Sequence, residues 1–529
     1  MTFTCQNGCG ETRTESIPAL DTIMYTVEYI VPNGVTEIDS QQVAEGFAVT
    51  LPEAGALEGY VFVGWTTTEY GGTEQPELYP FGTEYTVNEN TTLYALYTYT
   101  VGGYVLVTDV NDLAVGKEIV IVAAGFNHAL STTQNTNNRA PVAITKLGNT
   151  LEMNGDVQVI TLEEGTKEGT FAFKVADGYL YAASSSGNQL KTSNKKDDNA
   201  SWLITIDTKS SSAVASIKAQ GANTRNLLKF NAASNSLLFS CYASGQSDVC
   251  IYMNNSETYY TTGKIATIDS ASITVGEDLK VNYYVTSSIE LSKLTMSFSY
   301  GEKTVDVAGQ VAGNRYVFTL PMPPQCMADT ITADLKFGEF VLVTKGDYSI
   351  QTYAQNKLTA ADSSDELKRL LSDMLYYGAA AQVYKNYNLD NLASNVDGIL
   401  DVAEDVNPTQ GAQIVNAERE SYPAYFTGAN VWFGDVNKIY IKVNTIENVT
   451  MTINGGEEFA LDSTTYVIDN IMATQLMDEY TIELFYNGEL MQTLTYSIGA
   501  YAYAKAETEI GDLALALYRY GVSAKAYKA

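Results

Sequence analysis

Histidine and cysteine, the side chains that most often bind metals or act as nucleophiles, are scarce in this chain of 529 residues. Cys5 and Cys9 have the spacing of half a zinc site, which needs two more ligands, but His128 is the only histidine. A chain remnant or a small disulfide loop is therefore the favoured interpretation of this pair. A single histidine also excludes a three-histidine zinc site and most histidine-based triads. We expect no metal site and no cofactor.

The remaining cysteines raise the question of a disulfide. Cys241 and Cys250 flank the segment YASGQSDV, which places a turn between two strand-like runs. They would form a disulfide across a hairpin if the strand register set them opposite each other. Two buried thiols are the alternative. Cys326, which follows PMPPQ, is expected to be a packing residue.

Motifs typical of enzymes are missing from the sequence. There is no G-x-S-x-G, no P-loop and no Gly-rich fingerprint that opens a helix. The acidic segment NLDNLASNVDGILD, near Asp397, lacks the spacing of a calcium loop, and solvated carboxylates are the better interpretation. Carboxylate pairs from distant strands cannot be read from a sequence, although strings of small β modules rarely form such clefts. We expect no catalytic residues, and a protein that is not an enzyme.

Composition limits the partners that the chain can have. Asp and Glu total 62 against 31 Lys and Arg, so the formal net charge is −31. Such an acidic chain repels nucleic-acid phosphates and anionic membrane surfaces, so neither nucleic-acid binding nor membrane insertion is expected. No apolar run reaches the about 18 residues that a membrane-spanning helix needs. Residues 1–21 resemble a truncated repeat remnant, and we expect the sequence to be a fragment.

The elements that would position a site are mostly strands, because the pattern has period two between Gly, Asn and Ser turns. In residues 22–99 the runs GYVFVGWTT, YPFGTEYTV and TTLYALYT follow one another. Their order resembles the internalin-type B repeat (Listeria-Bacteroides repeat), a β-grasp-like module of bacterial surface proteins. Leu96 and Tyr97 stand where that family usually places a tryptophan. Trp65 is either a glycan-stacking platform or, as its apolar strand favours, a core residue. The resemblance is carried by Gly59–Trp65, Tyr79, Gly82, Tyr85–Val87 and Thr92–Ala95.

Residues 103–255 contain an internal three-fold repeat. The strand-like runs DVQVITL, ASWLITI and DVCIYM are similar, and matched leucines lie at Leu130, Leu180 and Leu228. This pattern predicts a β-trefoil-like barrel. β-Trefoils often bind sugars, but a fold does not supply a site, and the lectin-type glutamine-x-tryptophan signature is absent before Trp202. The candidate ligand-binding residues near repeat turns are Asn127, Tyr179 and Tyr181, with turn and barrel packing as the alternative.

Residues 262–390 and 412–529 are two copies of one module. Each has alternating strands, predicting a β-sandwich-like sheet, and each ends in a helix with a shared phrase, LYYGAAAQVYKNY or YRYGVSAKAYKA. The pair resembles a duplicated module, of no defined chemistry, in large secreted proteins of Gram-positive gut bacteria. Ser363 with Glu366 predicts a capping box for the first helix. Because each copy carries its own strands and helix, we expect each to fold independently.

The shared phrase predicts packing rather than a paired catalytic site. Its matched polar residues are tyrosines and a lysine, and no carboxylate is matched: Arg369 even aligns with Asp512. A duplicated catalytic site would keep its acid or base. The matched pairs are Tyr377 with Tyr520, Tyr384 with Tyr527 and Lys385 with Lys528.

Two functions fit these observations. The first is a non-catalytic extracellular bacterial protein, secreted or held on the cell wall, that serves adhesion or binds carbohydrate, with a glycan or a host or cell-surface ligand as its partner. The second is the accessory region of a secreted carbohydrate-active enzyme whose catalytic domain lies outside this sequence. A hydrolase domain in the full-length reading frame would favour the second; further repeats and a wall anchor would favour the first.

Overall fold

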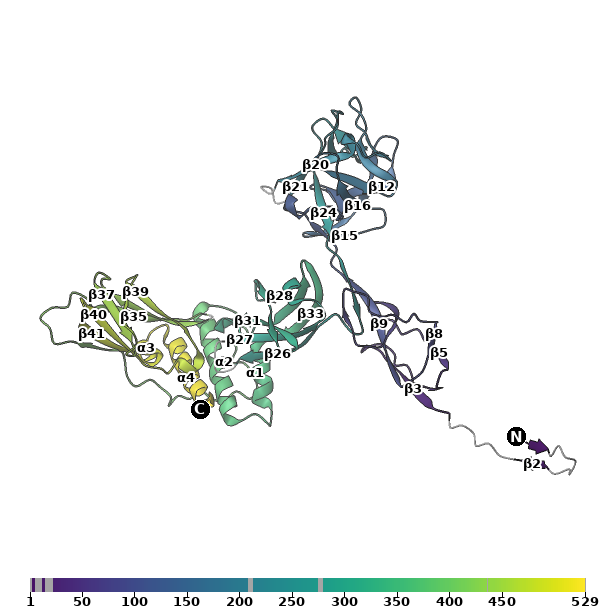
Figure 1. Ribbon diagram of the computed structural model, residues 1–529. Helices are drawn as coiled ribbons and strands as arrows, with labels where there is room; N and C mark the ends of the chain where they lie inside the picture. Colours follow the sequence, from purple (N-terminus) through teal and green to yellow (C-terminus); the bar gives the residue numbers. More distant parts are fainter. Residues whose placement is uncertain are drawn as a thin grey trace. The chain divides into compact units, whose positions relative to one another are not determined.

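The structure is a computed structural model that describes residues 2–4, 12–14, 22–207, 213–274, 279–434 and 436–528. The chain divides into two compact units, Met1–Ile265 with Phe337–Phe340, and Ala266–Lys336 with Val341–Ala529. Strands dominate both units, which confirms the predicted mainly β, multidomain fold (Figure 1). Among the described residues, no helix has both the length and the apolarity to cross a membrane.

The N-terminal segment contains a short antiparallel pair of strands. It joins β1 (Thr2–Thr4) to β2 (Thr12–Thr14). Cys5 and Cys9 lie outside the described residues, so the interpretation of that pair stays a prediction.

The first module of the first unit has a mixed sheet around its longest strand, β9, and a separate two-stranded sheet of β5 and β8. Strand β3 runs parallel to β9, whereas β6 pairs with β9 antiparallel. Trp65 on β6 is fully buried, its Nε1 donates to the Pro52 carbonyl at 2.8 Å, and the Tyr29 ring meets it edge-on at 5.0 Å. Trp65 is therefore a core residue and not a glycan platform. The strands are β3 (Met24–Ile30), β4 (Gln41–Ala44), β5 (Ala48–Thr50), β6 (Val61–Thr66), β7 (Gly71–Gly72), β8 (Glu84–Thr86) and β9 (Thr91–Val101).

A strand from much later in the chain also belongs to this sheet. β25 (Glu257–Thr261) pairs antiparallel with the end of β9, from Glu257 opposite Val101 to Thr261 opposite Tyr97. The trefoil module is thus inserted between two adjacent strands of the repeat. Gly102 has a φ of +86°, and a Cβ there would lie 2.6 Å from the Asn255 carbonyl oxygen, so the two strands can come this close only at a glycine.

The inserted module is a closed antiparallel barrel capped by hairpins (Figure 1). Each barrel strand pairs with the next, and β24 returns to pair with β11. The barrel strands are β11 (Glu118–Ala123), β16 (Ile160–Glu164), β17 (Phe171–Val175), β20 (Ser201–Asp207), β21 (Val214–Ala219) and β24 (Val249–Asn254). The hairpins are β12 (His128–Gln134) with β13 (Arg139–Ala143), β18 (Gly178–Ala182) with β19 (Leu190–Ser193), and β22 (Leu227–Asn231) with β23 (Leu238–Tyr242).

This arrangement is the predicted β-trefoil, in which each unit supplies a barrel strand, a hairpin and a second barrel strand. The matched leucines Leu130, Leu180 and Leu228 all lie on the first strand of a hairpin and are all buried in one core. The three-fold repeat is confirmed. Short additions are β10 (Tyr104–Leu106), β14 (Thr145–Leu147), β15 (Thr150–Glu152) and the 3₁₀ turns η1 (Val110–Asp112) and η2 (Asp198–Ala200).

Of the two alternatives for Cys241 and Cys250, the structure contradicts the disulfide and agrees with two buried thiols. Cys241 on β23 lies opposite Leu228, and Cys250 on β24 lies opposite Val122. The two sulfurs also belong to different apolar clusters, one inside the barrel and one outside it. Burial raises the pKa of both thiols, so both stay protonated at neutral pH. Cys326 is buried as expected of a packing residue.

In the second unit, the first copy of the duplicated module has two sheets that pack face to face. Tyr283 on β27 contacts Phe298 on β28, a strand of the other sheet, with ring centroids 5.1 Å apart. One sheet contains β26 (Ala266–Thr274), β27 (Lys280–Ser287), β31 (Arg315–Pro321) and β30 (Gln310–Ala312), and the other β29 (Lys303–Ala308), β28 (Leu294–Tyr300), β32 (Ile331–Phe337) and β33 (Phe340–Tyr348). The 3₁₀ turns are η3 (Leu291–Lys293) and η4 (Pro324–Cys326).

The second copy repeats this plan. Phe459 on β38 contacts Tyr466 on β39 across its two sheets at 5.0 Å, so the predicted β-sandwich-like fold is confirmed in both copies. One sheet contains β35 (Phe426–Trp432), β36 (Asn437–Val443) and β39 (Thr465–Ile471), and the other β34 (Gln413–Asn416), β41 (Glu489–Tyr496), β40 (Tyr480–Tyr486), β37 (Val449–Ile453) and β38 (Phe459–Ala460). The turn η5 (Ala473–Gln475) occupies the place of η4.

Each copy ends in a short and a long helix rather than in the single helix that the pattern predicted. The short helices α1 (Ile350–Thr359) and α3 (Ile498–Lys505) begin at matching caps, where Ser349 Oγ accepts from Thr352 N and Ser497 Oγ from Ala500 N, both at 3.0 Å. The long helices are α2 (Asp365–Lys385) and α4 (Gly511–Lys528). The cap of α2 is Ser364, one residue after the predicted Ser363.

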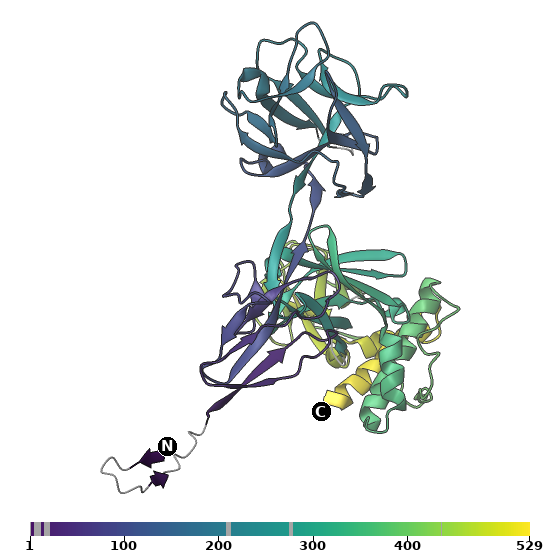
Figure 2. The same ribbon diagram turned by 90° about the vertical axis from the view of Figure 1, so that its right-hand side faces the viewer.

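The two long helices pack side by side (Figures 1 and 2). Tyr377 of α2 and Tyr520 of α4 are both buried and stack with centroids 6.0 Å apart at 15°. The residues following these tyrosines, Gly378 and Gly521, each lie close to the 3₁₀ turn of their own copy: a Cβ would stand 2.6 Å from Met327 Sδ and 2.7 Å from Leu476 Cβ. The repeated phrase is thus a packing motif, as predicted.

The stacked pair Tyr377 and Tyr520 joins equivalent positions of the two copies, as an approximate two-fold axis between them requires. Burial raises the pKa of Tyr501 on α3 and of Tyr353 on α1. A tyrosine near the end of the other copy's long helix adds a smaller effect in each case, Tyr384 for Tyr501 and Tyr527 for Tyr353. When two copies are related by a two-fold axis, each contact from the first copy to the second is repeated from the second copy to the first. The shared interface argues against the prediction that each copy folds independently.

Candidate functional site

Of the predicted trefoil ligand residues, Tyr179 is already engaged by its neighbours. Its hydroxyl donates to Glu163 Oε2 at 2.9 Å, and that oxygen also pairs with Lys196 Nζ at 3.1 Å. The Lys174 and Lys196 ammonium groups lie 4.8 and 5.6 Å from the centre of its ring. The hydrogen bond to Glu163 raises the pKa of Tyr179 and lowers that of Glu163.

The other two predicted residues lie on different trefoil units. Tyr181 shares the outer face of β18 with Tyr179 and is half-buried opposite Lys191. Asn127 is exposed in the turn between β11 and β12, where its carbonyl accepts from Ile144 N at 3.2 Å. The structure therefore brings the two tyrosines together on one strand and leaves Asn127 in a turn of another trefoil unit.

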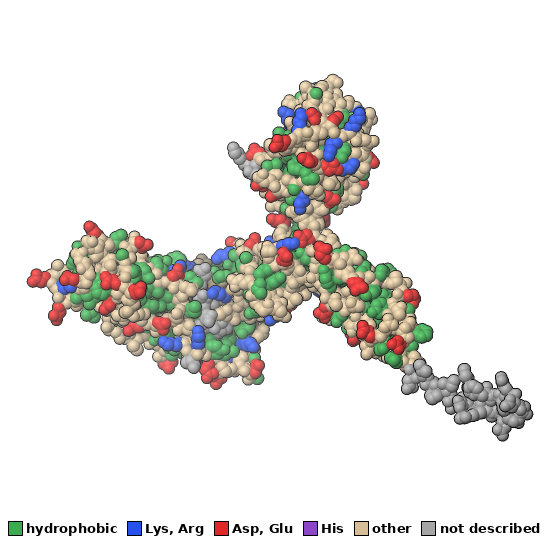
Figure 3. All heavy atoms as spheres, in the orientation of Figure 1, with side chains coloured by type: hydrophobic (Ala, Val, Ile, Leu, Met, Phe, Trp, Pro, Cys, Tyr) green, Lys and Arg blue, Asp and Glu red, His purple; other side chains and the backbone are tan. Residues whose placement is uncertain are grey.

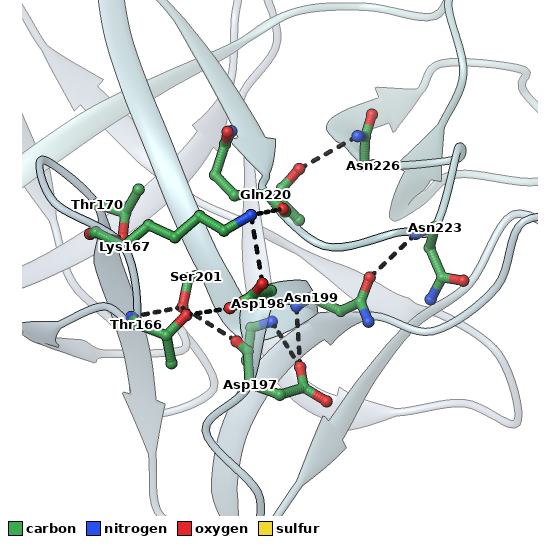
Figure 4. Close-up of polar contacts among 12 residues, drawn as sticks. Thr166, Lys167, Thr170, Asp197, Asp198, Asn199, Ser201, Gln220, Asn223 and Asn226 are labelled. Atoms are coloured by element: carbon green, nitrogen blue, oxygen red, sulfur yellow. Dashed lines mark hydrogen bonds and ion pairs between the residues drawn. The ribbon is translucent and has the colours of Figure 1, made fainter.

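Polar side chains gather instead around η2, in a set that we call the η2 cluster (Figure 4). Thr166 N donates to Ser201 Oγ at 2.9 Å, and Thr166 Oγ1 donates to Asp198 Oδ1 at 2.6 Å. Lys167 Nζ lies 3.3 Å from Asp198 Oδ2 and donates to the Gln220 carbonyl at 2.6 Å. The full set is Thr166, Lys167, Asp197, Asp198, Asn199, Ser201, Gln220 and Asn223.

Local sequence explains why the cluster forms. Asp197 caps η2 by accepting from Asn199 N at 2.9 Å and Ala200 N at 3.2 Å, which orients the next side chains. Asn199 Oδ1 then accepts from Asn223 N at 3.2 Å. A Cβ on Gly221 would lie 2.1 Å from Asn199 Oδ1, so glycine makes room for this contact.

The η2 cluster joins loops rather than poising an acid or base. Hydrogen bonds from Thr166 and Lys167 hold the pKa of Asp198 below its ordinary value, so the carboxylate stays charged. The polar groups of the η2 cluster are hydrogen-bonded to one another. Across the described residues, no three His, Cys, Asp or Glu side chains are grouped to hold a metal ion.

Next to the cluster, two loops from neighbouring trefoil units are bonded side chain to side chain. Ser185 Oγ donates to Asn223 Oδ1 and accepts from Thr224 N, both at 3.2 Å. Arg225 Nη1 donates to Asn188 Oδ1 at 2.7 Å. Ser185, Asn188 and Thr224 are exposed. We call these five residues, Ser185, Asn188, Asn223, Thr224 and Arg225, the rim.

The rim adjoins one predicted residue. Asn223 Nδ2 donates at 2.7 Å to the carbonyl of Ala182, which directly follows Tyr181. Sequence reasoning missed the rim because its loops are about 40 residues apart and carry ordinary turn residues. The repeat gave no signal either, because one loop follows Leu180 within a hairpin and the other precedes Leu228 between β21 and β22.

The distribution of charged side chains does not indicate a further binding site on the face shown in Figure 3. Acidic side chains are scattered over the face shown in Figure 3 rather than gathered in one patch. This distribution favours solubility over recognition of one charged macromolecule.

Fold and sites define the class: a modular, mainly β protein with a repeat module, an inserted β-trefoil and a duplicated β-sandwich module. Residues 25–96 match the Listeria-Bacteroides repeat domain, so this segment is such a repeat, as its motifs predicted. Repeats of this family occur in bacterial surface or secreted proteins, which indicates an extracellular or surface bacterial protein.

Similarity to solved structures is distant. A chain titled "BEL beta-trefoil apo crystal form 3" is 13% identical, with 28% of this chain and 99% of that chain covered, at a TM-score of 0.21. A chain of the lysenin pore is 15% identical, with 33% and 55% covered, at 0.18. Because these scores are low, the trefoil assignment rests on the strand pairing. No curated protein matches the chain.

Proposed function

We propose that this chain is the non-catalytic, ligand-binding part of a bacterial surface or secreted protein, and that its trefoil binds carbohydrate at the rim. Binding of this kind would serve adhesion to glycan-bearing surfaces. The observation that carries the proposal is the side-chain bonding of the two loops, which fixes exposed hydroxyl and amide groups beside a guanidinium.

The chemistry of the rim suits a sugar. Hydroxyls and amides both donate and accept, as sugar hydroxyls require, and Arg225 adds a charged donor. Because the η2 cluster and the closed barrel hold the loops in place, little entropy is lost when a ligand binds. The half-buried ring of Tyr181 lies at the base of one loop and offers an apolar surface.

The test is a glycan array probed with the full chain and with two matched variants. Arg225→Ala removes a rim donor, whereas Asn127→Ala removes an exposed amide in the turn between β11 and β12. We expect the wild type and Asn127→Ala to retain the same glycans, and Arg225→Ala to bind them at least about tenfold more weakly. Failure of the wild type to retain any glycan, or full retention by Arg225→Ala, would contradict the proposal.

A further inference from the structure

A hollow lies in the duplicated half, remote in sequence from the trefoil. It has a volume of about 580 Å³, which is within the range of small-molecule sites. Its walls come from three places: the end of α2, the end of β35, and the turn from α3 to α4. We call it the aromatic pocket.

Four aromatic side chains contribute to its walls, together with polar and charged residues. Trp432 and Tyr384 are 54% and 46% exposed, which is unusual for rings of this size. Phe433 and Tyr501, which also line the pocket, contact each other with centroids 5.7 Å apart. A Cβ on Gly434 would lie 2.8 Å from Trp432 Nε1, so a glycine there leaves room for the indole. The rings offer open faces on which a flat ligand can stack.

Charged groups border the rings. Lys385 Nζ lies 5.5 Å from the centre of the Tyr384 ring, and Lys505 Nζ lies 5.9 Å from that of Tyr501. Glu509 is the acidic residue in the lining. Two ammonium groups against one carboxylate make the pocket locally positive on a chain whose net charge is −31. Cationic ligands are therefore disfavoured, although an aromatic cage alone would suit them.

The sister copy shows that the fold does not need the exposed tryptophan. Trp432 pairs with Lys438 at the end of β35, and Thr274 pairs with Lys280 at the matching end of β26. Threonine thus stands in the first copy where tryptophan stands in the second. A large exposed ring contributes little to stability and lowers solubility, so its presence in one copy alone points to a ligand.

We infer that the aromatic pocket binds a carboxylated saccharide, with the sugar ring stacked on Trp432 and Tyr384 and the carboxylate near Lys385 and Lys505. The C–H groups of a pyranose face are weakly positive and are attracted to the negative face of an aromatic ring. Glu509, with the amide and hydroxyl groups of Asn430 and Thr508 in the lining, can pair with sugar hydroxyls. This site is separate from the rim and does not depend on it.

The test uses the full chain on an array of uronic-acid, sialic-acid and neutral glycans, followed by calorimetry with the best ligand and with choline. Trp432→Thr installs the residue of the sister copy, so its fold should be retained. Tyr384→Ala removes a pocket wall, and Tyr527→Ala removes the aligned tyrosine outside the pocket. We expect the first two variants to weaken binding of the acidic glycan about tenfold or more, and Tyr527→Ala to leave it unchanged.

Several results would overturn the inference: equal binding of acidic and neutral glycans, binding of choline instead, no glycan binding that survives Arg225→Ala, or unchanged binding by Trp432→Thr. Arg225→Ala separates the two sites. Binding that is lost with Arg225→Ala but kept with Trp432→Thr supports the rim and rejects the pocket. The opposite pattern supports the pocket and rejects the rim.

Discussion

The two copies of the duplicated module agree where they pack and differ where they are exposed. Both keep a tyrosine at the centre of the long helix, a glycine directly after it and a serine cap on the short helix. At the matching strand ends, the first copy has Thr274 and the second has Trp432. Residues kept in both copies therefore report on the scaffold, and a residue that one copy alone carries on its surface points to a function.

The largest expected effect lies at the axis between the copies. Tyr377→Ala and Tyr520→Ala should each cost about 3–5 kcal/mol of unfolding free energy, because each removes a buried ring. The double variant should cost less than the sum, by about 0.5–1.5 kcal/mol, since the two rings stack. Urea unfolding of residues 262–529 measures the unfolding free energies of the wild type, the two single variants and the double variant, which together form a double-mutant cycle. Tyr503→Ala, at an exposed ring, should stay within about 0.5 kcal/mol.

The repeated glycines should behave unequally, although they are aligned. An added methyl group on Gly521 would meet Leu476 Cβ, which the backbone fixes, whereas on Gly378 it would first meet the movable Met327 Sδ. Each alanine gains about 1 kcal/mol of helix propensity against an overpacking cost of about 1–3 kcal/mol. We expect Gly521→Ala to destabilise by about 1–2 kcal/mol and Gly378→Ala by less than that. Equal losses in thermal unfolding would show that the two turns pack alike.

The helix caps should behave equally. Ser349→Ala and Ser497→Ala each remove one side-chain acceptor from a backbone N–H, and each should cost about 1 kcal/mol. Because the two backbone bonds have the same length, the two losses in chemical denaturation should match to within the small added effect of the bond between Ser349 Oγ and Thr352 Oγ1 at 2.8 Å. Ser→Gly at either position should cost only a few tenths of a kcal/mol. A large difference between the copies would mean that one short helix is not held by its cap.

A smaller effect concerns an acid that one copy alone has. Burial raises the pKa of Asp373 on α2, although Arg369, Ser523 and Arg519 partly offset this, and the aligned residue of α4 is Ala516. The folded protein then holds this proton more tightly than the unfolded chain, so the contribution of Asp373 to stability is greatest at low pH and is lost as pH rises through the window above the ordinary pKa. Asp373→Asn should abolish this decline, as seen in urea midpoints compared between about pH 4 and about pH 7. Asp362→Asn, at an exposed position, should keep it.

Periodicity and internal repeats were sufficient to predict most of the architecture. The spacing of Leu130, Leu180 and Leu228 predicted the trefoil because each unit must bury the same position. The short helices α1 and α3 were missed, since eight to ten residues with polar and apolar positions mixed resemble a strand. β25 was missed because its pairing with β9 depends on where the inserted trefoil returns the chain.

The sites were harder to predict than the fold. The Cys241–Cys250 disulfide was wrong because register, which periodicity alone does not determine, places Leu228 and Val122 opposite the two sulfurs. The rim and the aromatic pocket are assembled from loops and helix ends far apart in the chain. In the sequence, Trp432 belongs to an ordinary strand pattern. Only the structure shows that it lines a pocket together with residues of α2 and α3.

The most direct test of the shared scaffold is the behaviour of the first copy alone. Residues 262–407, purified separately, would expose the face of α2 that α4 covers, including Tyr377. Light scattering with thermal unfolding should show either self-association through that face or a midpoint well below that of residues 262–529. A monomer that unfolds cooperatively at the same midpoint as residues 262–529 would show that the copies are independent, and would contradict the account.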